Sequence, residues 1–317
     1  MSFASDARGE MVRERADQVC CARAEVAAAL LFGGGIAYRG RGRYLLRVAS
    51  PDAFVVRHYF VLCKRFFGVT GEIGTLHTDQ LNMTRYQLLL PQEDGLQVLQ
   101  DCGLFDESAL FGLRAAPDDK TLVYACCRKA FLRGAFLLAG TVNNPERSYH
   151  LEFAAPSEEL AEFVIKLLNY FEISAKKACR KAKFVVYLKD GGQIADALTL
   201  MGAMNARMAM ENVRVKKEVR NRVNRQMNCD ERNLARQIEN AQAQIADIAL
   251  IEREIGLKRL PAPLREMARV RAEHPEGSLS ALGEFCKPPI GKSGVNSRLR
   301  RLREIAARLR AGEDTDI

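Results

Sequence analysis

Apolar and polar positions follow the same succession twice along the first two thirds of the chain. The stretches EVAAALLFGGG (25–35) and KAFLRGAFLLAG (129–140) are apolar and rich in small residues, which predicts two helices that allow close backbone approach. Each is followed by alternating apolar and polar residues, RYLLRVAS (43–50) and SYHLEFAA (148–155). Alternation of this kind predicts a half-buried strand in each copy.

Further helices and strands are predicted after these stretches. Pro51 and Pro156 end the strands, and Asp52 and Ser157 can cap the helices that begin there. The predicted ranges are roughly 52–67 and 157–172 for helices, 84–90 and 183–189 for strands, and 93–102 and 192–202 for two more helices. The coarse pattern is α-β-β-α-β-β-α, twice.

An ungapped shift of 105 residues aligns the two copies. Small, aromatic, apolar and proline positions coincide over some thirty-five residues, which indicates a repeated unit. The matched pairs are Gly35 with Gly140, Tyr44 with Tyr149, Leu46 with Leu151, Pro51 with Pro156, Val55 with Leu160, Leu62 with Leu167, and Phe66 with Phe171.

Two such units, each opened by a small-residue helix that ends in glycine, resemble the LAGLIDADG homing-endonuclease fold. The resemblance implies that the opening helices pack against each other and that the last acidic residue of each motif binds a divalent cation. In the ungapped alignment these positions are Gly34 and Ala139, and neither can ligate a metal. Asp52 and Glu158 lie elsewhere in the repeat. We therefore expect a catalytically dead scaffold with no catalytic and no metal-binding residues.

A basic segment follows the repeats. Leu234, Ile238, Ala241, Ile245 and Ile248 recur at helical spacing, which predicts an amphipathic helix capped by Asn228 or Asp230. This helix is either a linker that packs on one of the domains or a second contact with phosphates. The basic side chains available for such contacts are Arg214, Lys216, Lys217, Arg220, Arg222 and Arg225.

The last sixty residues predict three helices. LPAPLREMARVRAEHPEG contains the first, Ser278 caps the short second helix SLSALGEF, and CKPPIGK forms a turn. Ser293 is then expected to cap a third, basic helix. Its apolar stripe consists of Val295, Leu299, Leu302, Ala306 and Leu309. This order predicts an all-α helix-turn-helix domain.

In that motif the N-terminal part of the last helix enters the major groove. We expect four side chains to reach base edges, since asparagine suits adenine and arginine suits guanine. These are Ser293, Asn296, Ser297 and Arg300. Four more are expected beside phosphates, namely Lys292, Arg298, Arg301 and Arg303.

Charge supports a polyanionic partner. The chain carries a formal net charge of +9, and residues 205–317 hold 23 Lys and Arg against 16 Asp and Glu. Such asymmetry favours double-stranded DNA over a membrane. No apolar run reaches the ~20 residues of a membrane helix, and MSFASDARGEMVRER lacks an apolar signal core. We expect a cytoplasmic protein, at the nucleoid, with no membrane partner.

Nine cysteines include two adjacent pairs, Cys20-Cys21 and Cys126-Cys127. The odd count and the missing C-x-x-C spacing argue against a disulfide framework and against a zinc site. Reduced, mostly buried thiols and no cofactor are expected.

Three stretches together resemble the WhiA family, namely RGAFLLAGTVNNPERSYHLEF, NRQMNCDERNLARQIENAQAQI and PPIGKSGVNSRLRRL. The resemblance spans almost the whole chain. It implies a DNA-binding regulator of Gram-positive bacteria, linked to sporulation, cell division and chromosome segregation. The implied fold class is α+β, with tandem LAGLIDADG-like repeats at 1–105 and 106–204, a helical linker at 205–257 and a helix-turn-helix domain at 258–317.

Three functions follow in order of preference. The first is a non-enzymatic transcription regulator whose LAGLIDADG-like domain supplies a second surface, for DNA, a protein partner or a ligand. The alternatives are a metal-dependent DNA endonuclease that uses unrecognised carboxylates, and a nucleoid-associated adaptor of the division machinery. Arg39, Arg41, Arg43 and Arg47 either contact DNA or keep neighbouring strand edges apart.

Overall fold

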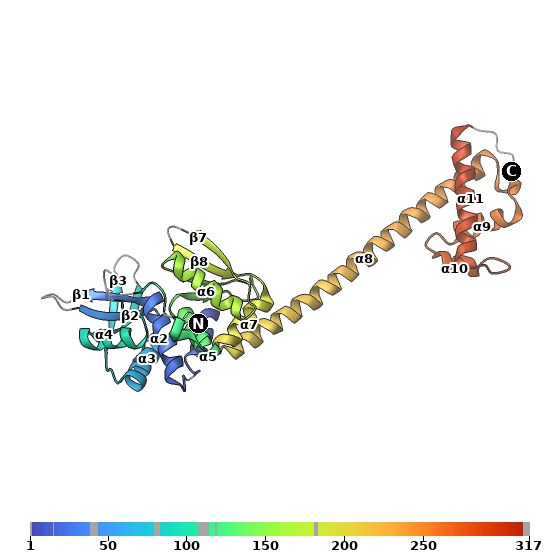
Figure 1. The fold of residues 1–317 in the computed structure, drawn as a ribbon. Coiled ribbons are helices and arrows are strands. Elements are labelled where there is room, and N and C mark those ends of the chain that lie inside the picture. The colour runs from blue at the N-terminus through green and yellow to red at the C-terminus, as the bar shows by residue number, and fades with distance from the viewer. Residues whose placement is uncertain are drawn as a thin grey trace. The chain divides into compact units, whose positions relative to one another are not determined.

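The computed structural model describes residues 2–14, 16–38, 44–78, 83–106, 114–117, 119–180 and 183–312. The chain divides into two compact units, Met1–Glu218 and Val219–Ile317 (Figure 1). One helix, α8 (Met204–Glu254), contributes residues to both units.

The first unit contains the repeat predicted from the sequence. After α1 (Phe3–Met11), each copy opens with a helix and carries a four-stranded antiparallel sheet. The first copy consists of α2 (Val19–Gly33), β1 (Gly34–Tyr38), β2 (Tyr44–Ser50), α3 (Ala53–Leu62) with a π-helical turn (Cys63–Phe67), β3 (Glu72–Thr78), β4 (Met83–Pro91) and α4 (Gln92–Asp101). The strand order is β1-β2-β4-β3.

The second copy repeats this topology with the strand order β5-β6-β8-β7. Its elements are a 3-10 turn (Asp119–Leu122), α5 (Ala125–Ala139), β5 (Gly140–Val142), β6 (Leu151–Ala155), α6 (Glu158–Tyr170), β7 (Lys176–Arg180), β8 (Lys183–Leu188) and α7 (Gly191–Met201). The predicted tandem α-β-β-α-β-β-α architecture is confirmed.

The ungapped alignment of the copies is wrong by one residue in the opening helices. Helices α2 and α5 match at a shift of 106, from Val19 to Ala125 and from Gly33 to Ala139. From β2 and β6 onward the shift is 105, because Gly34 pairs with Val48 while Gly140 pairs with Phe153. The copies therefore differ by one residue in the connection between their first two strands.

The opening helices α2 and α5 pack directly against each other, as the small residues predict. A Cβ atom at Gly134 would lie 2.5 Å from the carbonyl oxygen of Glu25 and 2.9 Å from the Cβ of Ala28. Only glycine permits this approach. One continuous apolar core surrounds the helix pair and includes Phe131, Phe136, Phe153, Leu88 and Leu90.

Of the two predicted caps in the repeats, one is confirmed. The Ser157 hydroxyl accepts the Leu160 backbone N–H at 3.2 Å and caps α6. Asp52 occupies the N-cap position of α3 without a capping bond. Its carboxylate instead accepts the Arg8 Nε–H at 2.7 Å, because α1, which the sequence patterns did not predict, packs beside it.

Helix α8 is continuous, so the predicted cap at Asn228 or Asp230 is wrong. Strong helix formers surround these residues without a glycine or proline, and Asp230 accepts an exposed bond from Gln226. Residues 218–240 are all exposed. The predicted apolar stripe is buried at Ala241 and Ile248 but exposed at Leu234 and Ile238.

The second unit has its own core, built by the end of α8 and three shorter helices. These are α9 (Ala262–Glu273), α10 (Leu279–Glu284) and α11 (Lys292–Ala311), preceded by a 3-10 turn (Leu257–Arg259). Core residues include Ile251, Met267, Leu282, Val295, Leu299 and Leu302. The predicted all-α helix-turn-helix fold is confirmed.

Of the two helix caps predicted in this unit, one is confirmed. The Ser278 hydroxyl accepts the Ala281 N–H at 3.3 Å and caps α10. Ser293 does not cap α11, because the helix begins two residues earlier than predicted, at Lys292, with Gly291 as its N-cap. The Ser293 side chain is thereby left on the helix surface.

Candidate nucleic-acid interface

Helix α11 is held at its N-terminal end by the turn that follows α10. The Ile290 N–H donates to the Gly283 carbonyl at 3.0 Å, and a Cβ atom at Gly283 would lie 2.1 Å from the Ile290 carbonyl oxygen. The Lys287 N–H donates to the Glu266 carboxylate of α9 at 2.7 Å. These contacts fix the turn, so the first turns of α11 have a defined place in the domain.

The face of α11 that points away from the core is polar. Lys292, Ser293, Asn296 and Ser297 are exposed and make no side-chain hydrogen bond or ion pair with the rest of the described chain. Residues three, four and seven apart share one side of a helix, so Ser293, Asn296, Ser297 and Arg300 form one surface. Seven of the eight residues predicted to contact DNA are exposed, all except Arg298.

Three of the exposed arginines have acidic neighbours within the domain. Arg300 and Arg301 lie 3.7 and 3.0 Å from the Glu304 carboxylate. Arg303 lies 4.0 Å from Asp247, a nearly buried carboxylate of α8 that also binds Arg310 at 2.5 Å. The exposed pairs of Arg300 and Arg301 with Glu304 contribute about 0–1 kcal/mol. A phosphate can therefore replace Glu304 as the partner of these two arginines at little cost.

Arg298 lies in a different environment from its neighbours. Its Nη1 donates to the Glu266 carboxylate at 3.1 Å, and its side chain is 23% exposed. Since Glu266 also accepts from the turn at Lys287, Arg298 and Glu266 connect α11, α9 and the turn. This geometry gives Arg298 a positioning role, and its predicted contact with a phosphate stays a prediction.

The sequence offered two further basic clusters as DNA contacts, one within residues 214–225 and one within residues 39–47. Arg214 donates to Glu211 at 2.7 Å, and Lys217 donates to the Pro145 carbonyl at 2.7 Å and lies over the Tyr149 ring. Both side chains are thus engaged within the first unit. Of the cluster that includes Arg47, a half-buried residue of β2, the other three members, Arg39, Arg41 and Arg43, lie outside the described residues.

The C-terminal ends of the opening helices, Gly33-Gly34 and Ala139-Gly140, carry no side chain that can bind a metal. The corrected alignment places Gly33 and Ala139 at the last helical positions, and Gly34 and Gly140 after them. A Cβ atom at Gly34 would lie 2.0 Å from the Leu30 carbonyl oxygen, so a carboxylate side chain does not fit there. The carboxylates that the LAGLIDADG resemblance requires are therefore missing at this point of the fold.

The cysteine pairs, by contrast, are brought together. Cys20 and Cys21 lie in the first turn of α2, Cys126 and Cys127 lie in the first turn of α5, and their four Sγ atoms all lie within 4.8 Å of one another. The missing C-x-x-C spacing does not exclude a metal site, because two pairs far apart in the sequence meet in the fold. The shift of 106 that aligns α2 with α5 also aligns these pairs and was the available signal.

The thiols differ in acidity. Burial raises the pKa of Cys126, but hydrogen bonds from Cys21 and Cys127 to its sulfur outweigh this effect and leave its pKa below the ordinary value. Burial, together with a hydrogen bond to Cys20, raises the pKa of Cys127 to about 12. The pKa of Cys21 is raised for the same reason, with Cys126 as its partner.

Comparison with known proteins gives three family models that match successive parts of the chain. Family models match for the WhiA N-terminal LAGLIDADG-like domain at 19–105, the WhiA LAGLIDADG-like domain at 128–220 and the WhiA C-terminal HTH domain at 223–306. The "Probable cell division protein WhiA" of Alkaliphilus metalliredigens is 39% identical over 315 residues, which is 98% of this chain and 99% of the relative. That of Caldicellulosiruptor saccharolyticus is 40% identical, over 98% and 97%.

The fold has a counterpart among solved structures. The crystal structure of full-length DUF199/WhiA from Thermatoga maritima is similar with a TM-score of 0.59 at 22% identity, over 97% of this chain and 99% of that one. The fold and the site thus define a LAGLIDADG-like tandem joined to a helix-turn-helix domain. The chain belongs to the WhiA family. Among its described residues, no helix is long and apolar enough to span a membrane.

Proposed function

We propose that this protein is a non-enzymatic transcription regulator that binds double-stranded DNA through α11. The observation that carries the proposal is the exposed polar face on the first turns of α11. Helix α11 is the last helix of a helix-turn-helix domain, and in that motif the N-terminal part of this helix enters the major groove. The name of its relatives, "Probable cell division protein WhiA", supports a role in cell division. Chromosome segregation and sporulation are the other processes that we assign to it.

In this proposal the exposed residues of α11 divide by chemistry. Asn296 and Arg300 read base edges in the major groove, with Ser293 and Ser297 beside them. Lys292, Arg301 and Arg303 bind phosphates, since lysine and arginine supply charge and donors without sequence preference. Arg298 acts through its bond to Glu266 by holding α11 in place.

The tandem repeat serves as a scaffold in this proposal. It lacks carboxylates at the helix ends, so it cleaves no phosphodiester by the metal-dependent route of the nucleases that it resembles. We assign it a contact surface for a protein partner, while the helix-turn-helix domain keeps the protein on the nucleoid. The proposed domains are the two LAGLIDADG-like repeats at 1–105 and 106–204, the helical linker at 205–257 and the helix-turn-helix domain at 258–317.

The test is fluorescence anisotropy with DNA fragments that the wild-type protein selects from a bacterial genomic library. Arg300→Ala and Asn296→Ala remove base contacts, and Arg269→Ala removes an exposed arginine of α9 as the matched control. One lost base contact weakens binding by ~1–3 kcal/mol, roughly fivefold to 150-fold. We expect this loss for the first two variants and less than threefold for the control.

Three results would contradict the proposal. Equal affinity of all three variants would move the contact surface away from α11. Cleavage of the fragments on a gel, dependent on added Mg²⁺, would favour the endonuclease alternative. Binding that is equally tight to selected and unselected fragments, with a steep salt dependence, would favour the nucleoid-associated adaptor.

A further inference from the structure

The four clustered cysteines are related by the repeat. Cys20 and Cys126 occupy the second position of their helices, and Cys21 and Cys127 the third. Because α2 and α5 pack against each other, both N-terminal ends bring their thiols to one point. The internal symmetry thus turns two adjacent pairs into a set of four sulfur atoms.

The spacing of these atoms suits a single ion. Zinc binds thiolates at about 2.3 Å, so the sulfur atoms of a tetrahedral site lie about 3.8 Å apart. The Sγ atoms of Cys126 and Cys127 lie 4.0 Å apart, and none of the four is farther than 4.8 Å from another. None of these distances therefore exceeds the tetrahedral value by more than about 1 Å. A disulfide needs an S–S distance of about 2.05 Å and is farther from the observed arrangement.

The helix ends beside the thiols oppose the effect of burial, which raises the pKa of Cys21 and Cys127. The first turn of a helix presents unpaired backbone N–H groups and the positive end of the helix dipole, and here two such ends converge. Each cysteine has a first-turn position, so all four thiolates would lie in this field. Lys129 lines the adjoining cavity and supplies positive charge there, while Arg133, which is paired with Glu25, and the acidic residues Glu14 and Asp17 line it as well.

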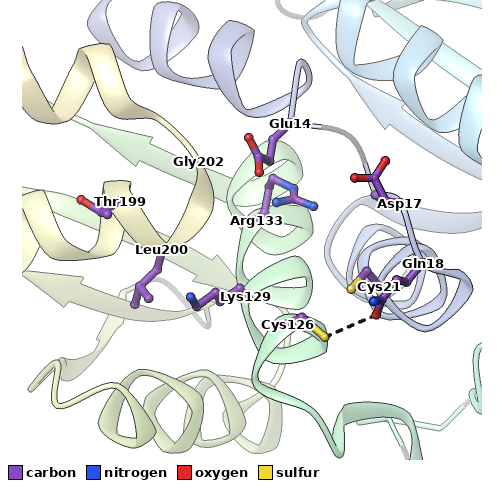
Figure 2. A pocket seen from close by; sticks show the side chains of 11 residues that line it. Glu14, Asp17, Gln18, Cys21, Cys126, Lys129, Arg133, Thr199, Leu200 and Gly202 are labelled. Carbon is purple, nitrogen blue, oxygen red and sulfur yellow. Dashed lines mark hydrogen bonds between the residues drawn. The ribbon is translucent and has the colours of Figure 1, made fainter.

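An ion can enter from solvent. Cys126 is exposed, Cys20 and Cys21 are partly buried, and Cys127 is buried. A cavity of about 350 Å³ opens beside them, and Figure 2 shows Cys21, Cys126 and Gln18 on its wall, with a dashed line for the hydrogen bond between Gln18 and Cys126. Gln18 Oε1 accepts from the thiols of Cys20 and Cys126 at 3.5 and 4.0 Å. It therefore lies next to the sulfur cluster and can orient it.

We propose that Cys20, Cys21, Cys126 and Cys127 form a tetrathiolate site for one zinc ion, which connects the two LAGLIDADG-like copies. Four protein ligands leave no open position for a water or a substrate, so the ion is structural. Binding releases the remaining thiol protons to solvent. The site lies at the N-terminal ends of α2 and α5, opposite the ends where the nucleases bind their cations.

The experiment uses the full chain, purified under reducing conditions, stripped with a chelator and titrated with Co²⁺ as a spectroscopic substitute for Zn²⁺. We expect about one Co²⁺ per chain, with the intense visible and near-ultraviolet bands of tetrahedral cobalt thiolate, and loss of these bands when Zn²⁺ is added. Cys126→Ser, at the exposed ligand, should lose nearly all of the thiolate signal. Cys179→Ser and Cys229→Ser, at exposed cysteines outside the cluster, should keep it.

A second measurement needs no variant. Alkylation of the wild-type chain, read by peptide mass spectrometry, should slow at least tenfold at Cys20 and Cys126 when Zn²⁺ is present, with no change at Cys179 or Cys229. The proposal is overturned if the wild type gives no thiolate bands or if Cys126→Ser gives the same bands. Recovery of the four cysteines as disulfides after reduction and chelation, without metal uptake, also overturns it.

Discussion

The carboxylate of Glu25 on α2 accepts two hydrogen bonds from the guanidinium of Arg133 on α5, at 3.1 and 2.8 Å, and both side chains are buried. The other Glu25 oxygen bonds to His58 Nε2 of α3 at 2.7 Å. A buried charge is tolerated only when it is paired and hydrogen-bonded. This ion pair therefore connects the two copies through the middle of their shared core.

Removing one member of this pair should destabilise the first unit. Glu25→Ala leaves the Arg133 charge buried without its partner, which costs about 3–5 kcal/mol. Arg133→Ala should cost a similar amount. The double variant Glu25→Leu/Arg133→Met should lose less than either single variant, since it buries no unpaired charge. Urea denaturation followed by circular dichroism measures this, and additive losses in the double variant would contradict it.

The same pair should make stability depend on pH. Burial raises the pKa of Glu25, but the hydrogen bond from His58 and the charge of Arg133 outweigh burial and lower it below the ordinary value. A carboxyl whose pKa is lowered by folding stabilises the folded state at pH values above its pKa in the unfolded chain, which is about 4.3. This stability is lost as the pH falls through the pKa of the carboxyl in the folded state. The melting temperatures of wild type and Glu25→Gln should therefore converge as the pH drops below about 4. A constant difference down to pH 3 would show that Glu25 does not titrate in this way.

Most of the fold follows from periodicity, and the errors have local causes. Alternation and helical spacing predict the elements of both copies because each copy buries one face of its sheet and one stripe of its helices. The ungapped shift placed Gly34 opposite Ala139 because a one-residue difference between β1 and β2 is invisible without the strand pairing. Asp52 failed as a cap because Arg8, far away in the sequence, binds it.

The candidate sites, too, could be predicted from the sequence only in part. The polar face of α11 could be predicted, because the buried stripe of Val295, Leu299 and Leu302 determines which side is exposed. The bond between Arg298 and Glu266 could not, since it depends on how α9 crosses α11. The proximity of the two cysteine pairs could not be predicted either, because it depends on the packing of α2 against α5.

Arg298 and Arg300 should respond differently to the same substitution. Arg298→Ala removes a partly buried bond to Glu266, so it should destabilise the second unit by about 1–2 kcal/mol. Arg300→Ala should change stability by less than about 0.5 kcal/mol, because its side chain is 75% exposed. Thermal unfolding separates the two, and DNA affinity should fall for Arg300→Ala at a temperature where both variants are folded. Equal melting temperatures would contradict the positioning role of Arg298.

Gly283 and Gly291 offer a matched pair of substitutions at the two sides of the turn. Gly283→Ala places a Cβ atom 2.1 Å from the Ile290 carbonyl oxygen, so the turn must shift, at about 1–3 kcal/mol. No atom lies within 4 Å of a Cβ built at Gly291, whose φ of −74° suits any residue. We expect weaker DNA binding and a lower melting temperature for Gly283→Ala, and a change of less than about 1 kcal/mol for Gly291→Ala. Equal behaviour of the two variants would show that the turn does not determine where α11 lies.

The salt dependence of DNA binding should distinguish the two groups of residues on α11. Each neutralised phosphate contributes about 0.9 to the slope of log affinity against log salt concentration. Lys292→Ala should therefore reduce this slope by about 0.9 and weaken binding to selected and unselected fragments alike. Asn296→Ala should leave the slope unchanged, because the amide neutralises no charge. It should reduce the difference in affinity between selected and unselected fragments, because the amide reads a base. Anisotropy titrations from low to high salt measure both quantities. A change of slope for Asn296→Ala, or none for Lys292→Ala, would mean that α11 approaches DNA with a different face.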